Sequence, residues 1–184
     1  MKKSLFPFTM LFVLLLLVAC GTESGDNNTK QPGNSVKTTK IDESEVTEGD
    51  FTYRLFVNNI ENHAVEIQAE LEYIGELDEI TISHAASPFY FYMKELERGY
   101  DIPFQMNEPH IITTLKKGVP IIETFRGSGG YSEEDDQDYI DFMKQMMSGH
   151  FPQGVYELNG TATFHDDIND QEYNIPGQLR FTVE

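Results

Sequence analysis

F-T-Y-R-L-F-V at residues 51–57 and V-E-I-Q-A-E-L-E-Y at residues 65–73 alternate apolar and polar side chains along their length. A period of two places every second side chain on the same face of a β-strand, so each stretch predicts a strand with one buried face. Residues 58–62 between them, N-N-I-E-N, predict the connection of a hairpin. The expected fold therefore starts with an antiparallel pair that has one apolar face.

Further short β patterns follow this pair, each bounded by turn residues such as 116–120 and 166–170. They lie at residues 80–82, 89–93, 111–115, 121–125, 155–164 and 179–183. Roughly eight short strands at this spacing predict an antiparallel β-sandwich. The sequence F-Y-F-Y at 89–92 puts aromatic rings on both faces of one strand. We expect one pair of rings in the core and the other covered by a helix, or else exposed as a partner surface.

One segment, residues 132–148, has helical periodicity. Ser132 and the acidic residues after it are typical of an N-cap and a first helical turn. Apolar side chains then recur at helical spacing up to Met147, and Gly149 is placed to end the helix. We expect a single amphipathic helix inserted between two strands.

The N-terminus carries an export pattern. Lys2 and Lys3 precede an apolar run over residues 5–18, and L-V-A-C-G follows at 17–21. These are the parts of a secretory signal, and the run is shorter than the roughly 20 residues that span a bilayer. The L-V-A-C-G segment resembles the lipobox of bacterial lipoproteins, which implies cleavage before Cys20 and transfer of a fatty-acid-bearing diacylglycerol to its sulfur. Cys20 is the only cysteine, so no disulfide forms within one chain.

Composition predicts three regions. Residues 21–50 are polar, with only Val36, Ile41 and Val46 as sizeable apolar side chains, and such a segment cannot offset its chain entropy by burial. We therefore expect a signal peptide at 1–19, a lipidated cysteine with a disordered linker at 20–50, and one sandwich domain at 51–184.

The chain is strongly acidic. Its formal charge is −18 and becomes −20 without residues 1–19, which carry Lys2 and Lys3. This charge argues against a nucleic-acid partner and against electrostatic adsorption to anionic lipid. It favours solubility, attraction of cations, or a basic partner.

A tyrosine motif refines the fold. F-P-Q-G-V-Y-E-L at 151–158 contains the Gly-x-Tyr that often opens the penultimate strand of immunoglobulin-like sandwiches, where the tyrosine hydroxyl bonds back to the backbone at a corner. Gly154 and Tyr156 are thus predicted structural residues, and Leu158 stands where antibody domains have a cysteine. We expect an all-β, immunoglobulin-like antiparallel sandwich with one inserted helix.

Together with F-V-N-N at 56–59 and L-K-K-G at 115–118, this motif resembles the intracellular proteinase inhibitor family of bacilli. The resemblance covers most of residues 51–184 and implies an immunoglobulin-like fold and, as one function, protease inhibition. The helix at 132–148 and the export signal depart from that family. No inhibitory loop is assigned.

The candidate chemistry is sparse. No serine or cysteine has the sequence context of a nucleophile, and R-G-S-G-G at 126–130 lacks the Lys-Ser/Thr of a phosphate loop. We expect no catalytic residue, no cofactor and no enzymatic activity.

Metal binding has one candidate group. The histidines, at 63, 84, 110, 150 and 165, lack metal-ligand spacing and are expected mostly in exposed loops. Thioethers and imidazoles suit copper(I), which makes Met143, Met146, Met147 and His150 copper candidates, although methionines at helical spacing also fill cores. The acidic stretches do not match a calcium-binding loop.

These patterns predict a lipid-anchored binding or accessory module on the extracytoplasmic face of the cell membrane, in contact with another envelope protein. The alternatives are capture of copper or a small ligand, and a protease-inhibitor-like domain.

Overall fold

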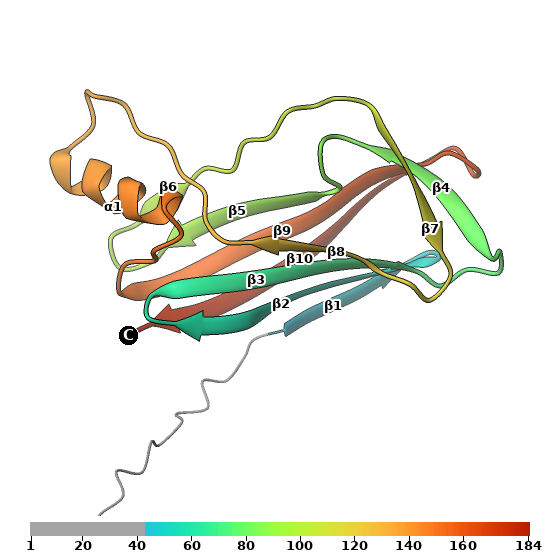
Figure 1. Cartoon of the computed structure of the whole chain (residues 1–184), viewed down its shortest axis with the longest axis horizontal. Helices are drawn as coiled ribbons and strands as arrows, with labels where there is room; N and C mark the ends of the chain where they lie inside the picture. Colours follow the sequence, from blue (N-terminus) through green and yellow to red (C-terminus); the bar gives the residue numbers. More distant parts are fainter. Residues whose placement is uncertain (1–42) are drawn as a thin grey trace, which may run out of the picture. The chain divides into compact units, whose positions relative to one another are not determined.

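Residues 43–184 are described by a computed structural model of the chain (Figure 1), and the predicted signal, Cys20 and most of the predicted linker lie outside them. Ten strands and one helix follow in this range. They are β1 (Glu43–Glu48), β2 (Phe51–Glu61), β3 (Ala64–Tyr73), β4 (Glu79–His84), β5 (Phe89–Glu95), β6 (Tyr100–Ile102), β7 (Ile111–Lys116), β8 (Ile121–Phe125), α1 (Gln137–Met147), β9 (Gly154–Asp166) and β10 (Gln171–Val183). The predicted fold class is confirmed, since the chain forms two antiparallel sheets in a sandwich-like arrangement with one short helix.

The two sheets differ in construction. One has the order β1-β2-β3-β8, and the other has β6-β5-β9-β4-β7 with β10 on β9. Strand β9 pairs with β5 up to Phe89↔Ala162, and with β4 only at its end, at Ser83↔His165 and Ile82↔Asp166. Strand β5 therefore pairs with the first part of β9, and β4 pairs with the last two residues of β9. Along this edge of β9 the second sheet splits into two branches. This division creates the cleft described below.

The core lies between the sheets and follows the predicted alternation. The alternating apolar residues of the two opening patterns are at most 3 % exposed: Phe51, Tyr53, Leu55, Val57, Val65, Ile67, Ala69, Leu71 and Tyr73. The Phe51 ring lies 4.7 Å from the Phe164 ring and 4.8 Å from the Tyr173 ring, on the opposing hairpin. A slip of one residue would turn this whole set to solvent, so burial sets the register.

A glycine pair in the β9–β10 hairpin admits large side chains from the facing sheet. Gly160 and Gly177 are register partners. A Cβ atom at Gly160 would lie 2.6 Å from Leu55 Cδ2 and 2.7 Å from the Tyr53 hydroxyl. The missing side chains therefore allow Tyr53 and Leu55 to approach the β9 backbone closely.

The β2–β3 connection is shorter than predicted. Strand β2 continues to Glu61, which pairs with Ala64, and its register shifts between Val57 and Asn59. The turn itself consists of Asn62 and His63, whose φ angles are 49° and 66°. A two-residue turn with both φ angles positive matches the twist of paired strands, and the bulge absorbs the extra residue.

The sandwich begins before residue 51. Residues 43–48, predicted as part of the disordered linker, form β1 and pair with β2 from Glu43↔Phe56 to Glu48↔Phe51. The E-S-E-V-T-E sequence has only Val46 as an apolar residue, yet an edge strand is stabilised by backbone pairing and needs few buried side chains. The predicted boundary at residue 51 is therefore wrong, and Glu43 already lies in the sheet.

Helix α1 begins later than residue 132. Residues 132–135 form a separate turn, in which the Ser132 backbone N–H donates to Asp135 Oδ2 at 2.6 Å. Such side-chain bonds compete with helical ones. The end is as predicted: Gly149 has φ 80°, and the His150 backbone N–H donates to the Gln145 carbonyl at 3.0 Å. No helix in residues 43–184 is long and apolar enough to cross a membrane.

The helix packs on β6, at the edge of the sheet next to β5. The Tyr100 ring lies 5.0 Å from Tyr139 and 5.2 Å from Phe142. Within β5, Phe89 and Phe91 are buried as expected, whereas Tyr92 is 47 % exposed. Of the two alternatives expected for the outer pair, exposure applies to Tyr92, whereas Tyr90 is half-buried with its ring 6.2 Å from Phe104. Strand β6 pairs along β5 and brings Tyr100, rather than the outer tyrosines, to the helix.

Candidate functional site

Tyr156 occupies a buried corner at the start of β9. Its ring is fully buried and stacks on Phe181 at 5.3 Å, and its hydroxyl donates to the Pro152 carbonyl. Burial raises the pKa of the Tyr156 hydroxyl. Gly154 lies against Glu95, since a Cβ atom there would be 2.7 Å from Glu95 Oε1. Both residues thus occupy structural positions at the start of β9.

Glu95 is a fully buried carboxylate that sequence analysis missed. It accepts backbone N–H bonds from Glu97 at 3.0 Å and from Arg98 at 2.7 Å. The Arg98 guanidinium lies 3.4 Å from Glu95 and also donates to the Gln153 carbonyl. A buried carboxylate with these donors is satisfied, so it serves to join the β5–β6 turn to the start of β9. Glu95 continues the alternation of the buried residues Phe91 and Met93, and this position in the sequence could have predicted its burial.

The copper candidates have unlike environments. Met143 and Met146 are fully buried in the core, whereas Met147 is 55 % exposed and His150 is exposed. In residues 43–184, no group of three or more His, Cys, Asp or Glu side chains is arranged to hold a metal ion. Copper binding stays a prediction, and the structure favours core filling for the two buried methionines.

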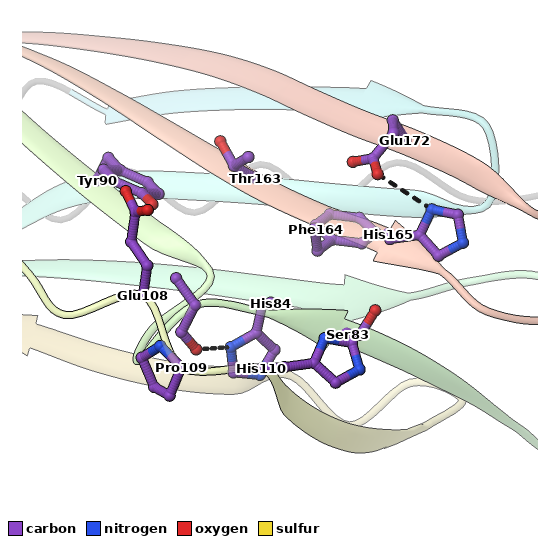
Figure 2. Close-up of a pocket in the computed structure, with 11 residues that line it drawn as sticks. Ser83, His84, Tyr90, Glu108, Pro109, His110, Thr163, Phe164, His165 and Glu172 are labelled. Carbon is purple, nitrogen blue, oxygen red and sulfur yellow. Dashed lines mark hydrogen bonds and ion pairs between the residues drawn. The ribbon is translucent and has the colours of Figure 1, made fainter.

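A cleft of about 500 Å³ opens where β4 and β5 part along β9 (Figure 2). Its wall residues are Ser83, His84, Ala85, Tyr90, Glu108, Pro109, His110, Thr163, Phe164, His165 and Glu172. Three of the five histidines meet here from separate segments. Most of the histidines are exposed outside the strands, as expected, namely His63, His110 and His150, whereas His84 and His165 lie in strands and are partly buried.

Backbone hydrogen bonds hold the walls of this cleft. The Thr163 N–H donates to the Pro88 carbonyl at 2.7 Å, and the Ala86 N–H donates to the Asn107 carbonyl at 3.2 Å. The first bond joins the β4–β5 connection to β9, and the second joins it to the segment before β7. The cleft is therefore bounded by main-chain contacts as well as by side chains.

Two of the histidines already have partners. His84 Nδ1 lies 2.8 Å from the Ala85 carbonyl, and His84 Nε2 lies 2.8 Å from Thr113 Oγ1. Because a carbonyl only accepts, His84 Nδ1 carries a proton. His165 Nδ1 lies 3.2 Å from Glu172 Oε1 without hydrogen-bond alignment, and its Nε2 lies 3.4 Å from Asp170 Oδ1.

Three other polar groups of the cleft are unengaged. The Glu108 carboxylate, the His110 ring and the Tyr90 hydroxyl have no hydrogen bond or ion pair with any residue between 43 and 184. Sequence analysis missed them because they come from β5 and from the segment before β7, with no motif spacing to connect them. Their free hydrogen-bonding capacity is available to a ligand.

A second feature is an apolar corner, defined as Ile74, Leu77, Val119 and Ile122. Their side chains are 43 %, 50 %, 56 % and 54 % exposed, respectively. The β3–β4 and β7–β8 connections lie at the same end of the sandwich (Figure 1), where the Gly118 N–H donates to the Tyr73 carbonyl at 2.9 Å. Strand β8 pairs only with β3, so its other edge is open next to this corner.

Comparison with known proteins gives no match to a protein-family model, to a curated protein or to a solved structure. Because a fold class hosts many activities, function has to be argued from these two surfaces.

Proposed function

We propose that this chain is a lipid-anchored module on the extracytoplasmic face of the cell membrane, and that its sandwich domain binds another envelope protein through the apolar corner. The export pattern and the single cysteine at residue 20 support the anchor. The polar segment after Cys20 supports a tether that lets the domain reach a neighbouring protein.

The observation that carries this proposal is the exposure of four large apolar side chains at one open edge of a strongly acidic domain. Between residues 51 and 184, 24 acidic and 8 basic residues give a formal charge of −16. Apolar side chains grouped on a charged surface are typical of a protein contact. The open edge of β8 adds a row of backbone groups that a partner strand can pair with.

Site-specific photo-cross-linking in cells tests this contact. The full chain carries a photoreactive residue at Val119 or Ile122, with Arg180 on the exposed face of β10 as the control position. We expect one defined membrane-associated product from the two corner positions and none from Arg180. Equal labelling from Arg180 would indicate nonspecific collision.

A matched pair of charge substitutions tests whether the corner provides the binding energy. Ile122→Glu places a charge in the corner, whereas Ile168→Glu places one at the β9–β10 turn, where Ile168 is 59 % exposed. We expect Ile122→Glu to abolish the cross-link from Val119 and Ile168→Glu to preserve it, with melting temperatures close to that of the unmodified chain. Retention of the cross-link in Ile122→Glu contradicts the proposal.

Capture of a small ligand is a second candidate function, because the cleft beside β9 has unengaged polar groups. Its ligand chemistry is argued next. Copper capture and protease inhibition stay predictions from the sequence.

A further inference from the structure

We infer that the cleft between β4, β5 and β9 is a binding site for an organic cation, a guanidinium or alkylammonium group, with Glu108 as its charge partner. This site is separate from the apolar corner and does not depend on the function proposed for it.

The size of the cleft suits a small organic group. Its volume of about 500 Å³ lies within the range of small-ligand sites, which is roughly 300–1,000 Å³. Its walls come from five segments of the chain held by main-chain hydrogen bonds. A ligand would therefore bind in an open cleft whose walls are already in place.

The lining is rich in acceptors and contains no lysine or arginine. Carboxylates come from Glu108 and Glu172, and His110 and the Tyr90 hydroxyl add unengaged groups. The Ser83 and Thr163 hydroxyls already donate to Asp167 and Asn174, so their oxygens can still accept. A guanidinium carries five N–H donors and no acceptor, and an alkylammonium carries three, so either complements such a wall. The acidic charge of the chain further raises the local concentration of cations.

The existing contacts indicate which end of the cleft receives the cation. Figure 2 shows the Glu108 side chain extending toward Tyr90, well away from the contact between Glu172 and His165. Glu172 is thus already next to a histidine ring, whereas Glu108 has no ion pair with any residue in the described range. A carboxylate beside an aromatic ring binds a cation by a charge-assisted hydrogen bond and by contact with the ring face.

An organic cation explains this lining better than a metal ion does. A protein metal site needs several ligand atoms converging at short distance, and the described residues contain no such group of three. His84 is also occupied through both ring nitrogens. An organic cation needs only one carboxylate, one ring and dispersed acceptors, which is the arrangement around Glu108.

Binding of propylguanidinium to the full chain in zwitterionic micelles tests the site, with propylammonium as the second cation and neutral propylurea as the matched uncharged control. Ligand-observed NMR gives the dissociation constants, and the His110 ring proton reports the location. We expect saturable binding of the cations, a shift of the His110 signal, and no saturation with propylurea. Comparable binding of propylurea, or no saturable binding of either cation, overturns the inference.

Two substitutions locate the contact. We expect Glu108→Gln to weaken binding at least about tenfold, since a hydrogen bond to a charged group is lost. Tyr90→Leu should weaken it several-fold through loss of the ring face. Glu133→Gln, an exposed position before α1, removes the same charge elsewhere and should leave binding unchanged. Equal weakening by Glu108→Gln and Glu133→Gln contradicts the site, and melting temperatures show whether each variant is folded.

The same chemistry could come from a free small molecule or from a basic side chain of a protein. A tripeptide amide with a central arginine, compared with its citrulline counterpart, separates these sources. Tighter binding of the arginine peptide than of propylguanidinium indicates a protein side chain, and weaker binding indicates a free cation. Either result supports the cation site, and neither changes the expected cross-linking at the apolar corner.

Discussion

At the scale of single residues, the Tyr156 hydroxyl connects β9 to the segment that precedes it. It donates to the Pro152 carbonyl from within the core, where its ring is fully buried. Tyr156→Phe keeps the ring and removes the donor, which leaves the carbonyl without this partner. We expect a loss of about 1 kcal/mol or more in the free energy of unfolding, measured by urea denaturation. An unchanged midpoint would contradict a stabilising role for this corner hydrogen bond.

Asp101 provides a prediction about pH. The Tyr92 hydroxyl donates to Asp101 Oδ1 at 2.8 Å and, with a smaller contribution from Lys94, holds the pKa of Asp101 below its usual value. A folded-state pKa below the unfolded one means that this contact stabilises the fold above the unfolded pKa. The stabilisation is lost as the pH falls through the folded pKa.

The test is an NMR titration of the Asp101 carboxyl carbon. We expect Tyr92→Phe to raise the pKa of Asp101 toward its usual value, because the donating hydroxyl is removed. Tyr131→Phe, at another exposed tyrosine, should leave the Asp101 titration unchanged. An Asp101 pKa that is the same in both variants would rule out the hydroxyl as the cause.

At the scale of secondary-structure elements, helix α1 places two methionines of the same apolar pattern in different environments. Met143 is fully buried, whereas Met147, one turn later, is 55 % exposed. We expect Met143→Ala to lower the free energy of unfolding by about 2–5 kcal/mol, through lost burial and a cavity. Met147→Ala should change it by no more than about 0.5 kcal/mol. Equal losses in chemical denaturation would contradict this packing.

The same pair of variants bears on copper. If α1 forms a copper(I) site, the thioether of Met147 is an accessible ligand, and Met147→Ala should weaken copper binding while stability is retained. If the methionines fill the core, copper(I) titration of the unmodified chain shows no tight site. The stability and copper measurements therefore distinguish the two interpretations of this helix.

At the scale of the whole molecule, attachment to the membrane is predicted to depend on Cys20 alone. A diacylglycerol contributes about 0.8 kcal/mol per buried methylene, and two acyl chains give firm attachment. The domain, at −16 between residues 51 and 184, has no electrostatic attraction to an anionic surface. We expect Cys20→Ser to block fatty-acid labelling and to leave the far-UV circular dichroism of the domain unchanged.

Metabolic labelling and membrane fractionation measure this outcome. The matched control begins at Gly21 behind a cleavable signal without a lipobox, and this form should be released in soluble form. Label on Cys20→Ser, or firm retention of the Gly21 form, would show that another part of the chain holds the protein at the membrane.

The alternating patterns predicted the core strands because alternation depends only on the order of side chains along one strand. Phe51 and Leu71 are buried as their patterns require, and Gly149 ends the helix as its missing side chain allows. The sequence pattern does not predict strand β1, because β1 has little apolar alternation. An edge strand is stabilised by pairing with its neighbour and needs few apolar side chains of its own. The sequence pattern extends the helix over residues 132–135 because a propensity pattern does not show their competing side-chain bonds.

The candidate sites depended on contacts distant in sequence. His84, Glu108 and His165 carry no common spacing, and they meet only because β5 and β4 share one edge of β9. Likewise, the apolar corner forms because the β3–β4 and β7–β8 connections, which both run between the two sheets, meet where the Gly118 N–H donates to the Tyr73 carbonyl. Local order along the chain specifies which faces of the strands are apolar, and burial of those faces then forms the sandwich. The positions at which the sheets divide and end follow from long-range pairing, and these positions bring the residues of the cleft and the apolar corner together.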